Sequence, residues 1–333
     1  MAMVDALADT GVDREALQRR TLRSLRFAQV PGQAAVAGMV AVVSLLASDL
    51  LGSDRLAGMG SASFTVGAAF TAIPLAAFMR RRGRRVGLVR ALLIGAAGAS
   101  VAATGGQLRW FPLFVIGMLA FGAGQAATLQ QRYVAADLAE PEQQGASIAA
   151  IVWVGTLGAA LGPLLTPFEK AVADRLGLDE LVGPFLFAAA FFLVAATVVW
   201  ARLRPDPLEV IGGIDPHAER VRLLRVVRSS SSVIWASPGA RLGIAALAAS
   251  QAAMVGVMTM TPPHMKDHGH ADLSALVIAL HIVGMYGLSP LVGRFVDRRG
   301  AVRGVQVGAF ILGTGTVTTV VAGQDRWPGT LSA

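Results

Sequence analysis

The chain has 333 residues, of which 54% are hydrophobic and only 15% charged, and it contains 38 glycines. This composition is too apolar for an ordinary soluble protein of this size and indicates a membrane protein. The absence of cysteine excludes disulfides, thiolate metal sites and cysteine nucleophiles. A net charge of +8 indicates nucleic-acid binding only if the basic residues share one surface. The positions of the basic residues along the chain therefore decide whether the charge indicates a nucleic-acid partner.

Nine stretches of 18 or more residues carry no Asp, Glu, Lys or Arg. Each is long enough to cross a hydrocarbon core about 30 Å thick as a helix of about 20 residues. They are 27–48, 56–79, 91–108, 110–131, 143–168, 181–201, 242–263, 273–293 and 304–324. We therefore predict an all-α, polytopic membrane protein with a six-helix N-terminal bundle, 27–201, and three helices of an incomplete second bundle within 242–333.

The basic residues are distributed unequally between the two sides of the membrane that these spans define. With residues 1–26 as a cytoplasmic tail, 23 of the 29 basic residues fall on the side of the tail and six on the other. The positive-inside rule then predicts a cytoplasmic N-terminus in a bacterial-type inner (plasma) membrane. The lipid bilayer explains the charge, and we predict no nucleic-acid partner. The tail itself is predicted to be a solvated helix that leads into the first span.

Asp49 lies near the outer end of the first predicted span. An acid at membrane depth is costly unless it faces a partner or an aqueous cavity. We find no deeper carboxylate in the first six spans, so Asp49 is the predicted proton-coupling acid. The alternative is an interfacial position beside Asp54 and Arg55.

Small residues are concentrated in the fourth and fifth spans. The fourth contains Gly122-Ala123-Gly124-Gln125, in which Gln125 is a candidate polar group for transport. The fifth holds a candidate helix-packing motif of Gly155, Gly158, Gly162 and Pro163. Glycines at this spacing allow close helix approach and the proline bends the helix. The alternative is that these small residues serve helix packing alone and have no part in transport.

The polar interval 202–241 separates six spans from the remaining three and is predicted to be a cytoplasmic linker. Within it, 220–228 interleaves arginines with aliphatic residues. This pattern favours a helix on the anionic inner leaflet or, equally, a solvated linker helix.

Histidines gather around the predicted outer loop between the seventh and eighth spans, at His264, His268 and His270. Their spacing permits a divalent metal site, but a solvated or pH-sensitive loop is the better interpretation, and we predict no metal site. His281, inside the eighth span, is a candidate transport or coupling residue, with core hydrogen bonding as an equal alternative.

The chain contains an internal repeat. A shift of 217 positions lays the first three spans on the last three, and Arg81-Arg82-Gly83 falls on Arg298-Arg299-Gly300. An offset of six helices returns the chain to the same side of the membrane, so the repeat is parallel.

The segment Gly293-Arg294-Phe295-Val296-Asp297-Arg298-Arg299-Gly300 lies between the eighth and ninth spans. With six spans, a basic linker and a second repeat, it resembles the cytoplasmic-loop signature of the major facilitator superfamily (MFS) of secondary transporters. The resemblance implies alternating access, with Gly293, Asp297, Arg298 and Gly300 helping to hold the outward-facing state. In the first repeat Ala76 and Arg80 replace the glycine and the aspartate, so we expect the arginines of this loop mainly to anchor the topology.

The segment at 155–163 looks like the motif of drug and metabolite exporters of the superfamily. The resemblance therefore implies a secondary transporter of small molecules, with proton-coupled export as the favoured activity and no enzyme or cofactor. The alternatives are an importer or facilitator, or a non-transporting remnant. Arg326-Trp327 matches Arg109-Trp110, which opens the fourth span, and only six residues follow it. We therefore expect a truncated chain, without helices 10 to 12, that does not transport by itself.

Overall fold

The computed structural model describes residues 14–53, 58–215, 231–232, 234–267 and 284–324. The chain divides into two compact units, Met1–Leu223 with Ile282–Gly293, and Leu224–His281 with Arg294–Ala333. All regular elements in the described ranges are helical. This is what a chain of apolar spans requires, because a helix satisfies its backbone hydrogen bonds within one segment.

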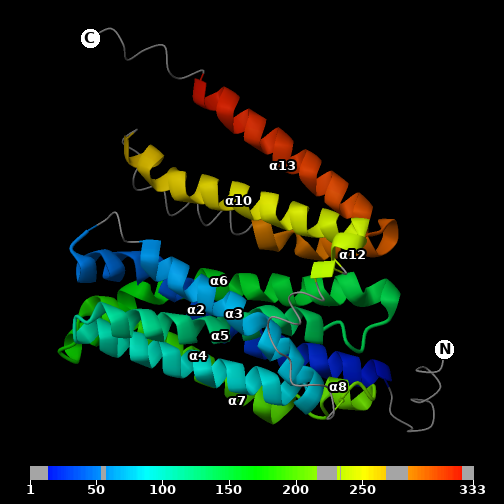
Figure 1. Ribbon diagram of the computed structural model, residues 1–333, viewed down its shortest axis with the longest axis horizontal. Coiled ribbons are helices and arrows are strands. Elements are labelled where there is room, and N and C mark those ends of the chain that lie inside the picture. Colours follow the sequence, from blue (N-terminus) through cyan, green and yellow to red (C-terminus); the bar gives the residue numbers. More distant parts are fainter. Residues whose placement is uncertain (1–13, 54–57, 216–230, 233, 268–283, 325–333) are drawn as a thin grey trace. The chain divides into compact units, whose positions relative to one another are not determined.

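Six helices of the first unit are long and apolar enough to cross a membrane (Figure 1). They are α2 (Arg14–Leu51), α3 (Gly58–Arg82), α4 (Arg84–Gln107), α5 (Phe111–Val134), α6 (Gln144–Arg175) and α7 (Gly183–Arg202). Short helices η2 (Pro141–Gln143), η3 (Glu180–Val182) and α8 (Pro207–Val210) lie next to their ends. The predicted six-helix composition of this bundle is thereby confirmed.

The helix predicted to be solvated before the first span is the first part of α2. Leu17 and Leu25 on it are buried. The Gln18 side-chain amide donates to the Ala135 carbonyl at 2.8 Å. The prediction of a solvated lead-in helix is therefore wrong for this face, because the turn between α5 and α6 covers it.

Helices α4 and α5 pack backbone against backbone. A Cβ atom added at Gly98 would overlap the Phe121 amide nitrogen and lie 2.7 Å from the Gly117 carbonyl oxygen. Around this contact the rings of Phe114, Phe121 and Phe192 are fully buried. Lipid is as apolar as these side chains, so close van der Waals packing, more than burial itself, holds such helices together.

The second unit contains α10 (Pro238–Asp267) and α13 (Ala301–Gln324), and α12 (Ser289–Arg299) crosses from the first unit into the second. The bounds of α13 are those of α4 displaced by 217 residues. Gly83 and Gly300, which precede the two helices, have φ values of 93° and 85°. Each donates its N–H to the residue four positions earlier, Met79 or Val296, at 2.8 Å. The predicted repeat therefore extends to main-chain geometry.

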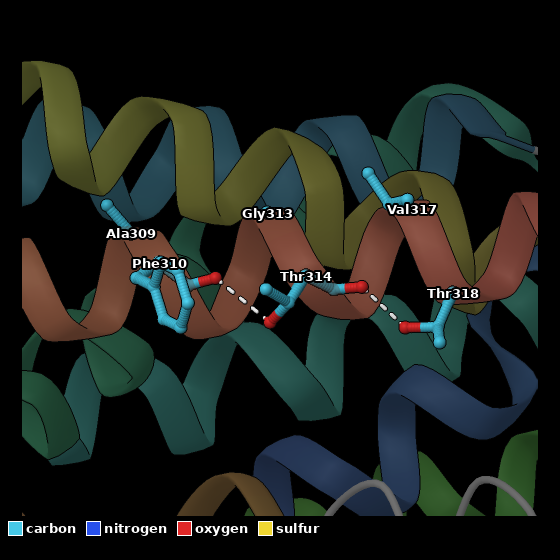
Figure 2. A pocket seen from close by; sticks show the side chains of 6 residues that line it. All are labelled: Ala309, Phe310, Gly313, Thr314, Val317 and Thr318. Atoms are coloured by element: carbon cyan, nitrogen blue, oxygen red, sulfur yellow. Dashed lines mark hydrogen bonds between the residues drawn. The ribbon is translucent and has the colours of Figure 1, made fainter.

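One face of α13 borders a shallow pocket with a volume of about 460 Å³, whose lining residues are drawn in Figure 2. The Thr314 and Thr318 hydroxyls donate to carbonyls of their own helix, at Phe310 and Thr314. The hydroxyls are thus used internally and the pocket is apolar. It is lined by Ala309, Phe310, Gly313, Thr314, Val317 and Thr318.

Candidate gate and transport residues

The basic end of the first bundle is where α3 meets α4, α5 meets α6, and α7 ends. At this end the Asp206 carboxylate accepts the backbone N–H groups of Arg84 at 3.1 Å and Arg85 at 2.8 Å. These are unpaired donors at the first turn of α4, where a negative charge is favoured by the helix dipole. Gly83 leaves the space, since a Cβ there would overlap the Asp206 side chain. Asp206 thus joins the end of α7 to the start of α4.

Arg84 also forms a two-point ion pair with Asp137, which follows α5, at 2.8 and 3.0 Å. The two side chains are 15% and 13% exposed. Burial raises the pKa of Asp137, and the hydrogen bond and charge of Arg84 oppose that rise. Arg84 thus has a structural role that the sequence did not predict, since it links three helix ends, and the expected role of these arginines as a topology anchor stays a prediction.

The motif glycine Gly293 lies against the first turns of α6, within the first unit. An added Cβ would be 2.6 Å from the Ala149 Cβ and 2.8 Å from the Gly145 carbonyl oxygen. One turn earlier, the Ser289 hydroxyl donates to the Ala149 carbonyl at 3.3 Å. We call the contact of Ser289 and Gly293 with Gly145 and Ala149 the gate contact. Only a residue without a side chain allows this approach of α12 to α6.

The other motif residues lie beyond this contact, on the last turns of α12 and after them. Asp297 is half-buried and Arg298 is exposed. Gly300 ends the helix with a positive φ, the conformation that favours glycine. The structure thus places Gly293 and Gly300 in positions that need glycine, and the gating roles of Asp297 and Arg298 stay predictions.

The glycines of the fifth predicted span face α2. A Cβ at Gly158 would overlap the Val30 carbonyl oxygen, and one at Gly162 would lie 2.5 Å from the Gly38 nitrogen. At Gly155 the nearest atom is the Gln29 side-chain nitrogen, at 3.2 Å. Pro163 is exposed. The structure shows a tight packing seam between α2 and α6, and its part in export stays a prediction.

Asp49 pairs with Arg109 at the opposite end of the bundle, where α4 meets α5. The Arg109 guanidinium donates to the Asp49 carboxylate at 2.8 Å, and the side chains of Arg109 and Asp49 are 58% and 44% exposed. The hydrogen bond that Arg109 donates to Asp49 raises the pKa of Arg109. The Asp49 carboxylate is thus engaged in an ion pair, and its role in proton coupling stays a prediction. The alternative partners Asp54 and Arg55 lie outside the described residues.

Glu169, near the end of α6, is a buried carboxyl that the sequence analysis missed. It is 1% exposed, and its Oε2 atom has no hydrogen-bond partner. Glu169 is therefore far more buried within the bundle than Asp49, whose side chain is 44% exposed. Helical periodicity was the available signal, because Glu169 follows Gly155, Gly158 and Gly162 on the buried face of α6. The predicted fifth span ends at residue 168, before its first charged residue, and so it does not include Glu169.

Buried amide side chains are further polar groups inside the bundle. The Oε1 atom of Gln125 on α5 has no hydrogen-bond partner, and the same is true of Gln29 on α2 and Gln131 on α5. Gln29 and Gln131 are 1% and 0% exposed. Gln125 is thus a buried acceptor available to a ligand or water, and its role in transport stays a prediction. The candidates His268, His270 and His281 lie outside the described residues.

Six membrane-length helices with tight glycine contacts define a polytopic helical membrane protein. Comparison with known proteins specifies the family. The Major Facilitator Superfamily model matches residues 28–331, and the chain belongs to this superfamily. Its members are transporters and not enzymes. The match gives no support to the expected truncation.

Two similar proteins come from Bacillus subtilis (strain 168). The uncharacterized MFS-type transporter YddS is 36% identical over 314 residues, covering 94% of this chain and 72% of YddS. The uncharacterized MFS-type transporter YdeG is 35% identical over 319 residues, covering 94% of this chain and 73% of YdeG. The riboflavin transporter RfnT of Brucella anthropi is 28% identical over 299 residues, covering 88% of this chain and 71% of RfnT.

Among solved structures, the human organic anion transporter MFSD10 (TETRAN) has the same fold. Its TM-score is 0.55 at 18% sequence identity, and the match covers 85% of this chain and 72% of MFSD10. The all-α, multi-pass membrane fold predicted from the sequence is thereby confirmed.

Proposed function

We propose that this secondary transporter is a proton-coupled exporter of small organic molecules in a bacterial inner membrane, with its N-terminus in the cytoplasm. The gate contact carries the proposal. In alternating access, one side of the protein closes when helices of the two repeats meet, and Gly293 of the second repeat lies here on α6 of the first bundle. The excess of arginine at this end supports a cytoplasmic position for the gate.

The seam on α6 supports export, because the exporter motif that it resembles lies at the tightest approach of α6 to α2. Buried acceptors such as the Gln125 Oε1 atom suit a ligand with polar groups on an apolar frame. The similar protein RfnT is named as a riboflavin transporter, and riboflavin is such a molecule.

Accumulation in cells tests the direction and the coupling. Cells that produce the full-length protein are expected to hold less ethidium or riboflavin than cells without it, and a protonophore should abolish the difference. A higher riboflavin level in the producing cells would instead favour the importer or facilitator. Equal levels of both probes, with or without the protonophore, would overturn transport of these molecules.

The gate contact is expected to open in the Gly293→Ala variant, because the new methyl group has no room beside Ala149 and Gly145. Overpacking of this kind costs about 1–3 kcal/mol, roughly a tenfold change in the closed population. A Ser289→Cys reporter in this cysteine-free chain should then react faster with a maleimide.

Gly284→Ala is the matched control, since nothing lies within 4 Å of an added Cβ at this other helical glycine. Equal labelling rates in the two alanine variants would contradict the gate contact.

A further inference from the structure

The last residue of α7, Arg202, is fixed against α2 at the basic end of the first bundle. The buried Ser24 hydroxyl on α2 shares its proton between two carbonyl oxygens, that of Arg20 at 2.8 Å and that of Arg202 at 3.2 Å. The last carbonyls of a helix lack partners within the helix, so Ser24 supplies a donor that α7 itself cannot provide. This contact sets the position of Arg202 beside α2.

The Arg202 guanidinium lies over the ring of Phe27 on α2, with its Cζ atom 4.7 Å from the ring centroid. The ring is 54% exposed, and Arg202 is exposed as well. The negative face of an aromatic ring attracts a cation, so the ring holds the guanidinium in place. The N–H groups lie in the plane of the guanidinium and stay available at its edge, where a phosphate can accept two parallel hydrogen bonds.

Two further arginines of α2 lie on the same side of that helix. Arg20 precedes Ser24 by four residues, and Arg23 precedes Phe27 by four residues. Positions i and i+4 share one face of an α-helix, so both arginines lie on the face that meets the end of α7. Both are exposed. We call Arg20, Arg23 and Arg202 the arginine triad.

The acidic residues of these elements are engaged elsewhere. Helix α7 has no acidic residue, and the two of α2 are paired with other arginines, Glu15 with Arg19 and Asp49 with Arg109. Asp206, which follows α7, accepts N–H groups at the start of α4. None of the ion pairs within the described ranges includes a member of the triad. Like charges that gather without a counter-charge favour an anionic ligand.

The surroundings of the triad are those of a membrane surface. Trp200, two residues before Arg202, is 56% exposed, and the Arg204 guanidinium lies over its ring at 5.1 Å. Exposed tryptophan is typical of the headgroup level of a bilayer. One and two turns before Arg202, α7 carries half-buried Val198 and Val194, which is 52% exposed. The triad therefore borders an apolar strip that can receive an acyl chain.

We propose that the arginine triad binds a phospholipid of net negative charge from the leaflet at this end of the bundle. The Arg202 guanidinium binds its phosphate, Arg20 and Arg23 add positive charge, and an acyl chain lies along Val198 and Val194. A zwitterionic lipid carries its own cation, which the triad repels, so phosphatidylglycerol is the class expected. The bound lipid joins α2 to α7. This site goes beyond the proposed function and does not depend on the direction or the coupling of transport.

Lipid binding to the purified full-length protein in detergent tests the site. Native mass spectrometry counts bound molecules while dioleoyl phosphatidylglycerol, dioleoyl phosphatidylcholine or glycerophosphate is titrated. The variants are Arg202→Gln and Arg202→Lys, and the bond from Ser24 survives in both because it goes to the main chain. Arg26→Gln is the matched control. Arg26 is an exposed arginine of the same helix, and it lies about 100° around the helix from Phe27.

The parent is expected to bind phosphatidylglycerol more tightly than phosphatidylcholine. Arg202→Gln should weaken the binding of phosphatidylglycerol about tenfold, the effect of losing one charge-assisted hydrogen bond. Arg202→Lys should also weaken it, because an ammonium group lacks the planar fork that binds phosphate at two points. Arg26→Gln should bind like the parent.

Three results would overturn the proposal. Equal losses in Arg26→Gln and Arg202→Gln would mean that net charge alone attracts the lipid. Equal affinity for the two lipids would remove the preference for an anion. Displacement of phosphatidylglycerol by glycerophosphate at the same concentration would assign the site to phosphate without a lipid.

Thermal unfolding provides an independent measurement and shows whether the variants fold. Phosphatidylglycerol should raise the melting temperature of the parent and of Arg26→Gln more than that of Arg202→Gln, because a ligand of the folded state stabilises it. Phe27→Leu keeps all three arginines and removes only the ring, so it carries the test if the Arg202 variants do not fold. Unchanged lipid binding in Phe27→Leu would contradict the stacked arrangement on which the site depends.

Discussion

The Gly98→Ala variant is expected to lose about 3 kcal/mol of folding free energy, a value at the upper end of the range for overpacked cores. The added methyl group would overlap the Phe121 nitrogen and lie 2.6 Å from the Ala120 carbonyl carbon. These are backbone atoms, so no side chain can rotate away and α4 must move from α5. Thermal unfolding in detergent, followed by tryptophan fluorescence, measures the loss.

The repeat supplies a matched control for this variant. Gly315 occupies the position of Gly98 displaced by 217 residues, in the interior of α13, and an added Cβ there meets nothing within 4 Å. Gly315→Ala should therefore be neutral or stabilising by up to about 1 kcal/mol, as expected for alanine in place of a helical glycine. Equal melting temperatures for the two variants would refute the close contact between α4 and α5.

The Arg84→Met variant is expected to lose about 3 kcal/mol at neutral pH, because breaking a largely buried ion pair leaves one charge uncompensated. That charge is Asp137, whose pKa is already raised by burial and held down in part by Arg84. Without Arg84 its pKa rises further. Exposed Arg82 provides the control, and Arg82→Met should unfold like the parent.

The loss in Arg84→Met should depend on pH with a definite sign. A raised pKa means that the folded protein binds the proton of Asp137 more tightly than the unfolded chain does. Stability therefore falls as pH rises from the ordinary carboxyl pKa through the folded one, and the full loss is present above both. Unfolding curves at pH 5 and pH 8 should show the larger loss at pH 8.

The double variant Arg84→Met with Asp137→Asn isolates the cause, because it removes both charges. It should be more stable than Arg84→Met at pH 8, and the pH effect of that single change should disappear. A pH-independent loss in the single variant would show that Arg84 acts through packing alone.

The polar contacts between residues far apart in the chain could not be predicted from the sequence. Arg84 and Asp137 are 53 residues apart, and Arg84 and Asp206 are 122 apart. Each helix end was predictable, but no local pattern states which ends meet. The same holds for Glu169, whose charge marked the end of a span in the sequence while its place on the face with Gly162 buries it.

The sequence by itself determined the helices, their number in the first bundle and the 217-residue repeat. Uncharged runs must form helices in lipid, since no water satisfies the backbone there, and glycines at Gly83 and Gly300 permit the positive φ of the turns. Tertiary structure alone decided which glycines lie at backbone contacts and which carboxyl is buried. Both depend on how far one helix is rotated and shifted against another, and that follows from the simultaneous packing of all six helices.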